Sequence, residues 1–216
     1  KRSLFQYFKY LCIMNFSKTI LNWYALNGRE LPWRQTTNPY AIWLSEVIMQ
    51  QTRIAQGTAY WERFMKRWPN VYALAEATED EVLREWQGLG YYSRARNLRK
   101  AAQQIVEKGY FPQTFNELIE IKGVGEYIAS AILSISFAIP VAVVDGNVYR
   151  VLSRYFGIET PIDSTEGKKV FKTMAQEYLA KENPAAYNQG IMDFGAIQCT
   201  PVAPKCEICP LIETCF

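Results

Sequence analysis

The chain has 216 residues, 49% of them hydrophobic, and Lys and Arg outnumber Asp and Glu by 24 to 21, giving a net charge of +3. A chain of this size and composition can bury a core in one domain or two closely packed lobes, which excludes disordered and fibrous classes. The absence of His from the sequence excludes Ser-His-Asp triads, His-ligated metals and imidazole acid–base catalysis.

Nearly every segment carries the apolar period of three to four residues that is typical of amphipathic helices. The sequence therefore predicts an all-α protein. The only candidate for extended structure is the short stretch IPVAVVD, at 139–145. In chain order, the capping patterns predict helix starts after Asn38, after Thr78, in the 114–116 region, after Asp145 and after Ser164.

The longest apolar run, at 124–144, is interrupted by Glu126 and Pro140. It does not resemble a membrane span, which needs about 20 consecutive apolar residues, so we expect a soluble protein. The first residues lack the cleavage pattern of a secretion signal and are expected to precede a natural start at Met14.

Two carboxylates stand in contrasting settings. Glu46 lies within the apolar helical stretch PYAIWLSEVIMQQT, where it must pair with a cation, keep its proton or act in catalysis. Asp145 ends an apolar run and precedes a helical pattern, so we expect an N-cap, where the helix dipole favours the ionised form. Taken alone, the first residue more often pairs with an Arg, and the second is more often only a cap.

Two apolar helical patterns flank the tight turn KGVG, in the form of a helix-hairpin-helix. Glycines permit positive φ and leave backbone N–H groups at a helix N-terminus, where they can bind a phosphate. The candidate phosphate-binding residues are Lys122, Gly123, Val124 and Gly125. An ordinary αα-corner is an equally good interpretation of the turn alone.

Upstream of this hairpin, a Gly-rich turn carries Tyr91 and Tyr92 and is followed by four basic residues: Arg94, Arg96, Arg99 and Lys100. Basic residues beside exposed aromatic rings can clamp a nucleic-acid backbone while a ring enters the base stack. The alternative is that these basic residues form the solvated face of a helix.

Four of the five cysteines lie near the C-terminus, with the spacing C-x6-C-x2-C-x5-C: Cys199, Cys206, Cys209 and Cys215. Clustered thiols without secretion features indicate a metal site rather than disulfides. Structural zinc sites commonly use two C-x-x-C pairs, so a single pair flanked by two separate cysteines favours a [4Fe–4S] cluster over zinc. The cluster would hold the C-terminal loop together and could present Lys205 to a phosphate.

The GVG hairpin, the VDGNVYRV stretch and the cysteine spacing resemble the endonuclease III superfamily of DNA glycosylases, over about residues 16–216. Within it, LPWR, SEVIMQQT, GLGYYSRARNL and VDGNVYRVLSR resemble the MutY-type adenine DNA glycosylases. The resemblance implies a six-helix barrel lobe with the helix-hairpin-helix, at 30–138, packed on a helical iron–sulfur lobe formed by 1–29 and 139–216.

The same resemblance implies the activity. It predicts a monomeric base excision repair enzyme, cytoplasmic and, in a bacterium, associated with the nucleoid. The enzyme would bind double-stranded DNA containing A:8-oxoguanine or A:G mispairs, flip the adenine and hydrolyse its N-glycosidic bond.

Site residues follow from the matching motifs. Glu46 corresponds to the catalytic acid and Asp145 to the catalytic aspartate, with Tyr127 and Asn147 beside the reaction centre. Gln51 and Tyr91 correspond to residues that enter the base stack. The adenine pocket would be lined by Arg29, Leu31, Trp33, Arg34, Met49 and Gln189.

Bifunctional relatives carry a lysine two residues after GVG, where this chain has Tyr127. A phenol cannot form an imine, so we expect base excision without efficient lyase activity. Two alternatives remain: a pyrimidine- or mismatch-specific glycosylase/lyase of the same fold, and a non-catalytic DNA-binding module. Because enzymes of this type usually continue into a domain that helps to read 8-oxoguanine, a chain ending at Phe216 is either a catalytic domain or a naturally short member.

Overall fold

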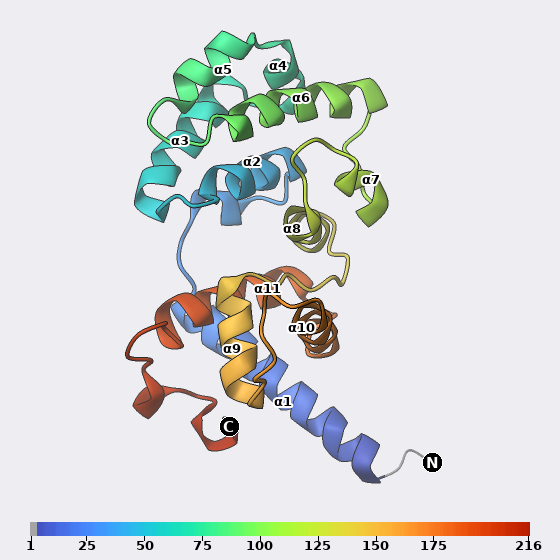
Figure 1. Cartoon of the computed structure of the whole chain (residues 1–216), viewed down its shortest axis with the longest axis vertical. Helices are drawn as coiled ribbons and strands as arrows, with labels where there is room; N and C mark the ends of the chain where they lie inside the picture. Colours follow the sequence, from blue (N-terminus) through green and yellow to red (C-terminus); the bar gives the residue numbers. More distant parts are fainter. Residues whose placement is uncertain (1–3) are drawn as a thin grey trace. The chain divides into compact units, whose positions relative to one another are not determined.

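The computed structural model describes the backbone from Leu4 and the side chains from Asn15, in both cases to the end of the chain at Phe216, so Cys12 and the expected start at Met14 lie outside the described side chains. The prediction of an all-α protein is confirmed: residues 4–216 contain helices and no strand (Figure 1). Across this described part, no helix is both long enough and apolar enough to cross a membrane.

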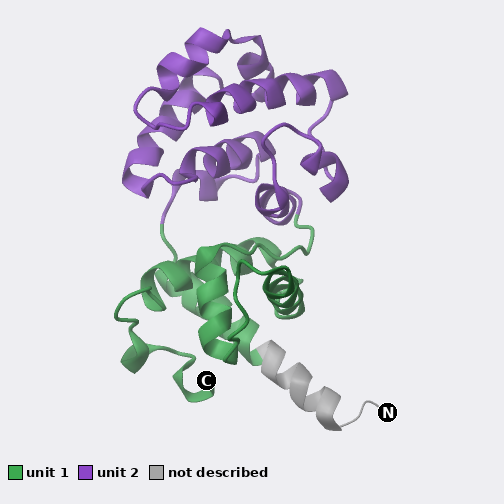
Figure 2. Cartoon of the chain, viewed as in Figure 1, with its two compact units in different colours: residues 1–29, 138–216 green, residues 30–137 purple. Residues whose placement is uncertain are grey.

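The chain divides into two compact units (Figure 2). Unit 1 combines residues 1–29 with 138–216, and unit 2 is the continuous segment 30–137. The sequence-based division placed the second boundary one residue later, after 138.

Unit 2 is built around a nearly buried helix, α2 (Pro39–Met49), which contacts α3, α6 and α8. Asn38 caps α2 by accepting a hydrogen bond from the backbone N–H of Tyr40 at 2.9 Å, and Pro39 occupies the first turn. A helix that is apolar on almost every face is stable only when other helices surround it. The other elements of unit 2 are η1 (Pro32–Gln35), α3 (Ile54–Arg67), α4 (Val71–Glu76), α5 (Glu79–Trp86), α6 (Ser93–Lys108), α7 (Phe115–Ile119) and α8 (Glu126–Ser136).

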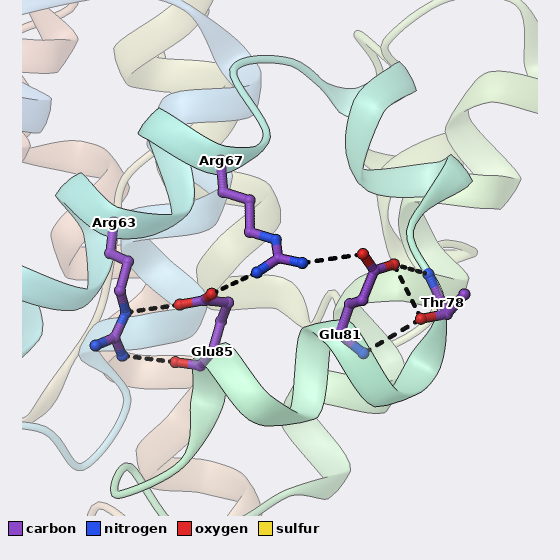
Figure 3. Close-up of polar contacts among 5 residues, drawn as sticks. All are labelled: Arg63, Arg67, Thr78, Glu81 and Glu85. Carbon is purple, nitrogen blue, oxygen red and sulfur yellow. Dashed lines mark hydrogen bonds and ion pairs between the residues drawn. The ribbon is translucent and has the colours of Figure 1, made fainter.

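Exposed ion pairs connect α3 with α5 at the surface of unit 2 (Figure 3). Arg67 contacts Glu85 at 2.7 Å and Glu81 at 2.9 Å, while Arg63 contacts Glu85 at 2.9 Å. Glu81 also closes a capping box with Thr78, the N-cap of α5. Hydrogen bonds from Thr78, reinforced by Arg67, hold the pKa of Glu81 below its usual value. Each exposed ion pair contributes little to folding stability. We therefore infer that the network mainly orients α5 against α3.

Unit 1 consists of four helices and three short turns in its described part. They are α1 (Leu4–Asn27), α9 (Gly146–Phe156), α10 (Thr165–Glu177), α11 (Pro184–Asp193), the π-helical turn η2 (Phe194–Gln198), and the 3-10 turns η3 (Cys206–Ile208) and η4 (Ile212–Thr214). Aromatic side chains from α1, α9, α10 and α11 meet in its core, including Phe16, Phe171 and Tyr187, each at most 1% exposed.

The stretch at 138–144, part of the 139–145 candidate for extended structure, forms neither helix nor strand, and Ala138 at its start has a left-handed backbone with a φ of 53°. The buried amide of Asn188 accepts a hydrogen bond from the backbone N–H of Val143 at 3.1 Å and donates one to the carbonyl of Val141 at 2.9 Å. Gln176 does the same for Ala142 and Pro140, at 3.0 and 2.8 Å. Two side chains thus satisfy backbone groups that a neighbouring strand would otherwise pair, and they fix the segment that leads to Asp145.

Candidate functional site

Asp145 is the N-cap of α9, which confirms the prediction for this residue. Its Oδ1 accepts a hydrogen bond from the backbone N–H of Val148 at 2.8 Å, and its Oδ2 accepts one from Nδ2 of Asn147 at 2.7 Å. The side chain is half-buried. Both oxygens are therefore held in one orientation, while part of the carboxylate remains accessible to a substrate.

A series of hydrogen bonds leads from Asp145 to the cysteine segment. Asn147, bound to Asp145, accepts a hydrogen bond through Oδ1 from Nη2 of Arg150 at 2.8 Å, and Nε of Arg150 donates to the carbonyl of Cys199 at 2.8 Å. Gly195 permits the close approach of η2 to α9, because a Cβ at this position would lie 2.6 Å from Cβ of Asn147. One face of α9 thus serves both the carboxylate and the first cysteine.

The loop after Cys199 is fixed by side chains from α9 and η2. Arg154 donates to the carbonyl of Thr200 at 2.7 Å and to that of Pro201 at 3.0 Å, and it lies 3.5 Å from Sγ of Cys199. Gln198 and Lys205 close the loop with two hydrogen bonds, at 2.6 and 3.0 Å.

All four cysteines of the quartet line one cavity, together with apolar side chains such as Val151, Phe194 and Leu211. All four are free thiols, two of them half-buried and two exposed. Burial, and then the neighbouring thiols, raise the pKa of Cys209 and of Cys215. Deprotonation of these two thiols is therefore less favourable than usual, and a bound metal would offset that cost.

The four thiols line a cavity but do not converge on one point. No three His, Cys, Asp or Glu side chains among the described residues surround a single point as ligands of one ion do. In a [4Fe–4S] cluster each thiolate binds a different iron, so the sulfurs are spread around a cavity, whereas four zinc ligands converge on one ion. Four cysteine thiols on one cavity are a donor set that either centre can use, and only their spacing, with a single C-x-x-C pair, favours a cluster.

Glu46 lies on α2 in unit 2, among buried apolar neighbours. Its side chain is half-buried. Met49, on the same helix, packs over Gly57 of α3, where a Cβ would lie 2.4 Å from its Cε. Leu31, just before η1, and Trp33, within it, are buried, with 8% and 7% of their surface exposed. Arg34 is half-buried.

Arg29 and Gln189, the other two expected pocket residues, lie in unit 1 and have protein partners. Arg29 binds the fully buried carboxylate of Asp193 through its backbone N–H and its guanidinium. Gln189 is 9% exposed, and its Oε1 accepts a hydrogen bond from the hydroxyl of Tyr24 at 2.7 Å. No local pattern identifies Asp193 or Tyr24 as partners, because both contacts join segments more than 160 residues apart.

Gln51 and Tyr91 line one open pocket in unit 2, together with Gln50, Ser93 and Arg94. Both have left-handed backbones, with φ of 54° and 46°, which is uncommon outside glycine. Tyr91 is 64% exposed. The structure therefore brings together the two residues expected to enter the base stack.

The KGVG turn joins α7 to α8, as predicted for the hairpin. Gly123 has a φ of 79°, and Gly125 is the N-cap of α8 without a described side chain capping the helix. Val124 is buried, whereas Lys122 is exposed and its backbone N–H donates to Gln104 at 2.7 Å. Tyr127, in the first turn of α8, is half-buried. A helix N-terminus open in this way can receive an anion.

Comparison with known proteins places this geometry in a family. Residues 44–177 match the family model described as HhH-GPD superfamily base excision DNA repair protein. The adenine DNA glycosylase of Buchnera aphidicola subsp. Schizaphis graminum is 40% identical over 209 residues, which cover 95% of this chain and 60% of that protein. The adenine DNA glycosylase of Homo sapiens is 40% identical over 211 residues, covering 93% and 39%. The chain thus spans about 60% or less of the length of these relatives.

Solved structures show the same fold. A thermostable thymine-DNA glycosylase matches with a TM-score of 0.87 and 27% identity, over 94% of each chain. Endonuclease III in a non-covalent complex with DNA matches with a TM-score of 0.78 and 22% identity, over 95% of this chain and 94% of that one.

Proposed function

Because this chain belongs to the HhH-GPD superfamily of base excision DNA repair proteins, we propose that it hydrolyses the N-glycosidic bond of adenine mispaired with 8-oxoguanine or guanine in double-stranded DNA. The observation that carries the proposal is the Asp145 carboxylate, oriented by the start of α9 and by Asn147. The adenine DNA glycosylase names of relatives at 40% identity support adenine as the base.

The reaction needs a proton donor and an anion. Glu46 would donate its proton to a ring nitrogen of the flipped adenine, so that the bonding electrons leave with the base. Asp145 would face C1′ and stabilise the oxocarbenium-like cation until water adds there and leaves an abasic site. Tyr127 and Asn147 would lie beside this centre, Asn147 by holding Asp145.

Binding would use the remaining candidate site residues. Gln51 and Tyr91 would enter the base stack, and Lys122, Gly123, Val124 and Gly125 would bind a backbone phosphate. The flipped adenine would contact Arg29, Leu31, Trp33, Arg34, Met49 and Gln189, with Arg29 and Gln189 held by Asp193 and Tyr24.

Cys199, Cys206, Cys209 and Cys215 would hold a [4Fe–4S] cluster. The bound cluster would supply the positive charge that four thiolates in one cavity require, and would cross-link the segment from Cys199 to the end of the chain. Arg150 and Arg154 already anchor that segment to α9.

A second candidate is removal of thymine from a T:G mispair, which the similarity to the thymine-DNA glycosylase favours. A substrate panel separates the two: duplexes with A:8-oxoguanine, A:G, T:G and A:T, under single-turnover conditions. We expect release of adenine from the first two. Release of thymine without adenine would contradict the proposed function and favour the second candidate. Binding without release of any base would indicate a non-catalytic DNA-binding module.

The same reactions test for lyase activity. With Tyr127 at the position of the lysine, strands should break only after alkali treatment, and borohydride should trap little covalent complex. Direct nicking at the rate of base release would assign lyase activity to this chain.

A further inference from the structure

We propose that Arg94 is a positioning residue that fixes Gln51 and Tyr91 in the conformation needed to enter the base stack. The proposal rests on the proposed function, since it concerns how the target base is extruded. Its basis is a single guanidinium that joins the two backbone segments carrying these residues.

Arg94, at the start of α6, reaches the end of α2. Its Nη1 donates to the carbonyls of Val47 at 3.0 Å, Ile48 at 3.3 Å and Gln50. These are among the last carbonyls of the helix, which lack partners within it, and Gln50 directly precedes Gln51. A cation at this end also interacts favourably with the helix dipole.

The same guanidinium binds the turn that carries Tyr91. Its Nη2 donates to the carbonyl of Leu89 at 3.3 Å. Its central carbon lies 5.1 Å from the ring centroid of Trp86 and 5.6 Å from that of Tyr91. Burial lowers the pKa of Arg94, but an arginine retains its charge at neutral pH.

Side chains bind four consecutive carbonyls of this turn. Tyr60 donates to Gln87 at 2.6 Å, Gln56 to Gly88 at 3.3 Å, Arg94 to Leu89, and Trp86 to Gly90 at 2.9 Å. Among these four donors, Arg94 is the one with described hydrogen bonds to the end of α2 as well. It therefore couples the turn to the segment before Gln51.

Left-handed backbone at non-glycine residues persists only where the surroundings fix it. Gln51 and Tyr91 both have such a backbone, and Tyr91 presents an exposed ring. A ring that enters a base stack meets a restoring force from the DNA, so its backbone must not yield. The contacts of Arg94 supply that resistance on both segments.

The test compares Arg94→Gln and Arg94→Lys with the matched control Arg99→Gln. Arg99 lies on the same helix and donates to the carbonyl of Ala77, at the end of α4. Its replacement therefore removes a similar contact between arginine and carbonyl, but one that joins α6 to α4. Each protein is assayed on an A:8-oxoguanine duplex and on a duplex with the adenine in a single-base bulge. Thermal unfolding shows how much stability each variant loses.

A base that is already unpaired costs less to extrude, so it should depend less on Arg94. We expect Arg94→Gln to slow excision from the mispaired duplex about 10- to 100-fold, as small misplacements do, and to slow excision from the bulge much less. Arg94→Lys should be intermediate, because an ammonium lacks the fork that spans both segments. Arg99→Gln should change both rates equally or not at all.

Equal losses by Arg94→Gln on both substrates, or no loss, would overturn the proposal. Fluorescence of 2-aminopurine beside the mispair reports unstacking without requiring excision. If the wild-type chain released adenine from neither substrate, the proposed function would fail, and this signal would still decide the role of Arg94. Unstacking by the wild type but not by Arg94→Gln would support it, and any other pair of signals would contradict it.

Discussion

Asp145 performs two separable tasks, one structural and one chemical. As the N-cap of α9 it binds the backbone of Val148, and as a carboxylate it binds Asn147 and offers an anion. Asparagine caps helices about as well as aspartate but carries no charge. Replacement of this residue can therefore separate the fold from the reaction.

The free energy of unfolding of Asp145→Asn should lie within about 1 kcal/mol of the wild-type value, because asparagine still caps α9. Its single-turnover excision rate should fall by roughly 10²–10³-fold, the usual effect of losing a group that stabilises charge in the transition state. Asp145→Ala is the control, because it should lose both the rate and the cap. An Asn variant that excises at the wild-type rate would make Asp145 only a cap.

Arg94 has hydrogen-bond partners that lie far from it in the sequence. The sequence suggested either a clamp for a nucleic-acid backbone or a solvated helix face, but the Arg94 side chain is half-buried and hydrogen-bonded to protein carbonyls. Its guanidinium binds carbonyls that lie up to 47 residues away. A contact of that range depends on how α2 and α6 pack, which no local pattern encodes.

At the scale of elements, local chemistry predicted the helix starts well. Asn38, Thr78, Thr114, Asp145 and Ser164 all cap helices where the sequence placed them. A cap binds the N–H of a residue two or three positions along the chain, so its signal lies within one short window. The irregular stretch before Asp145 is different, because its partners are Gln176 and Asn188 in later helices.

The capping box of α5 should make stability depend on pH. The pKa of Glu81 is lowered in the folded chain, mainly by Thr78. A carboxylate with a lowered folded-state pKa stabilises the fold above its unfolded value, about 4.3, and this contribution is lost as pH falls through the folded-state pKa. Thr78→Ala should therefore lower the unfolding midpoint more at pH 7 than at pH 3.

Ser164→Ala is the matched control for this prediction. Ser164 caps α10 by accepting from the backbone N–H of Gly167, without a hydrogen bond to a carboxylate among the described contacts. Its loss should cost about the same at both pH values. If Thr78→Ala also showed equal losses, the lowered pKa of Glu81 would not contribute to stability.

At the scale of the whole molecule, the sequence predicted a lobe at 30–138, and the corresponding compact unit of the structure spans 30–137. The clue was the resemblance of motifs across nearly the whole chain, since no linker composition marks either boundary. The spacing of the cysteines likewise predicted that they gather, and they line one cavity. The anchoring of their loop by Arg150 and Arg154 was not foreseen, because arginines on a helix usually face solvent.

The proposed cluster should be detectable without any assay of activity. Cys206 is exposed, so Cys206→Ser removes one sulfur with little loss of packing. We expect the wild-type chain to contain four irons and to absorb visible light, and the variant to lose both and to be cleaved faster by protease after Cys199. Cys12→Ser, outside the quartet, should change neither property. A wild-type chain with zinc in place of iron would contradict the assignment.

Base release by Glu46→Gln, measured beside DNA binding, tests the catalytic account most directly. Glutamine keeps the shape of the side chain but cannot deliver the proton, so binding to an A:8-oxoguanine duplex should persist while single-turnover excision falls by at least roughly 10²–10⁴-fold. The wild-type rate should decline as rising pH removes the proton, and any residual activity of the variant should lack that decline. If Glu46→Gln instead released adenine at nearly the wild-type rate while losing folding stability, Glu46 would be a structural partner within α2 and not the catalytic acid.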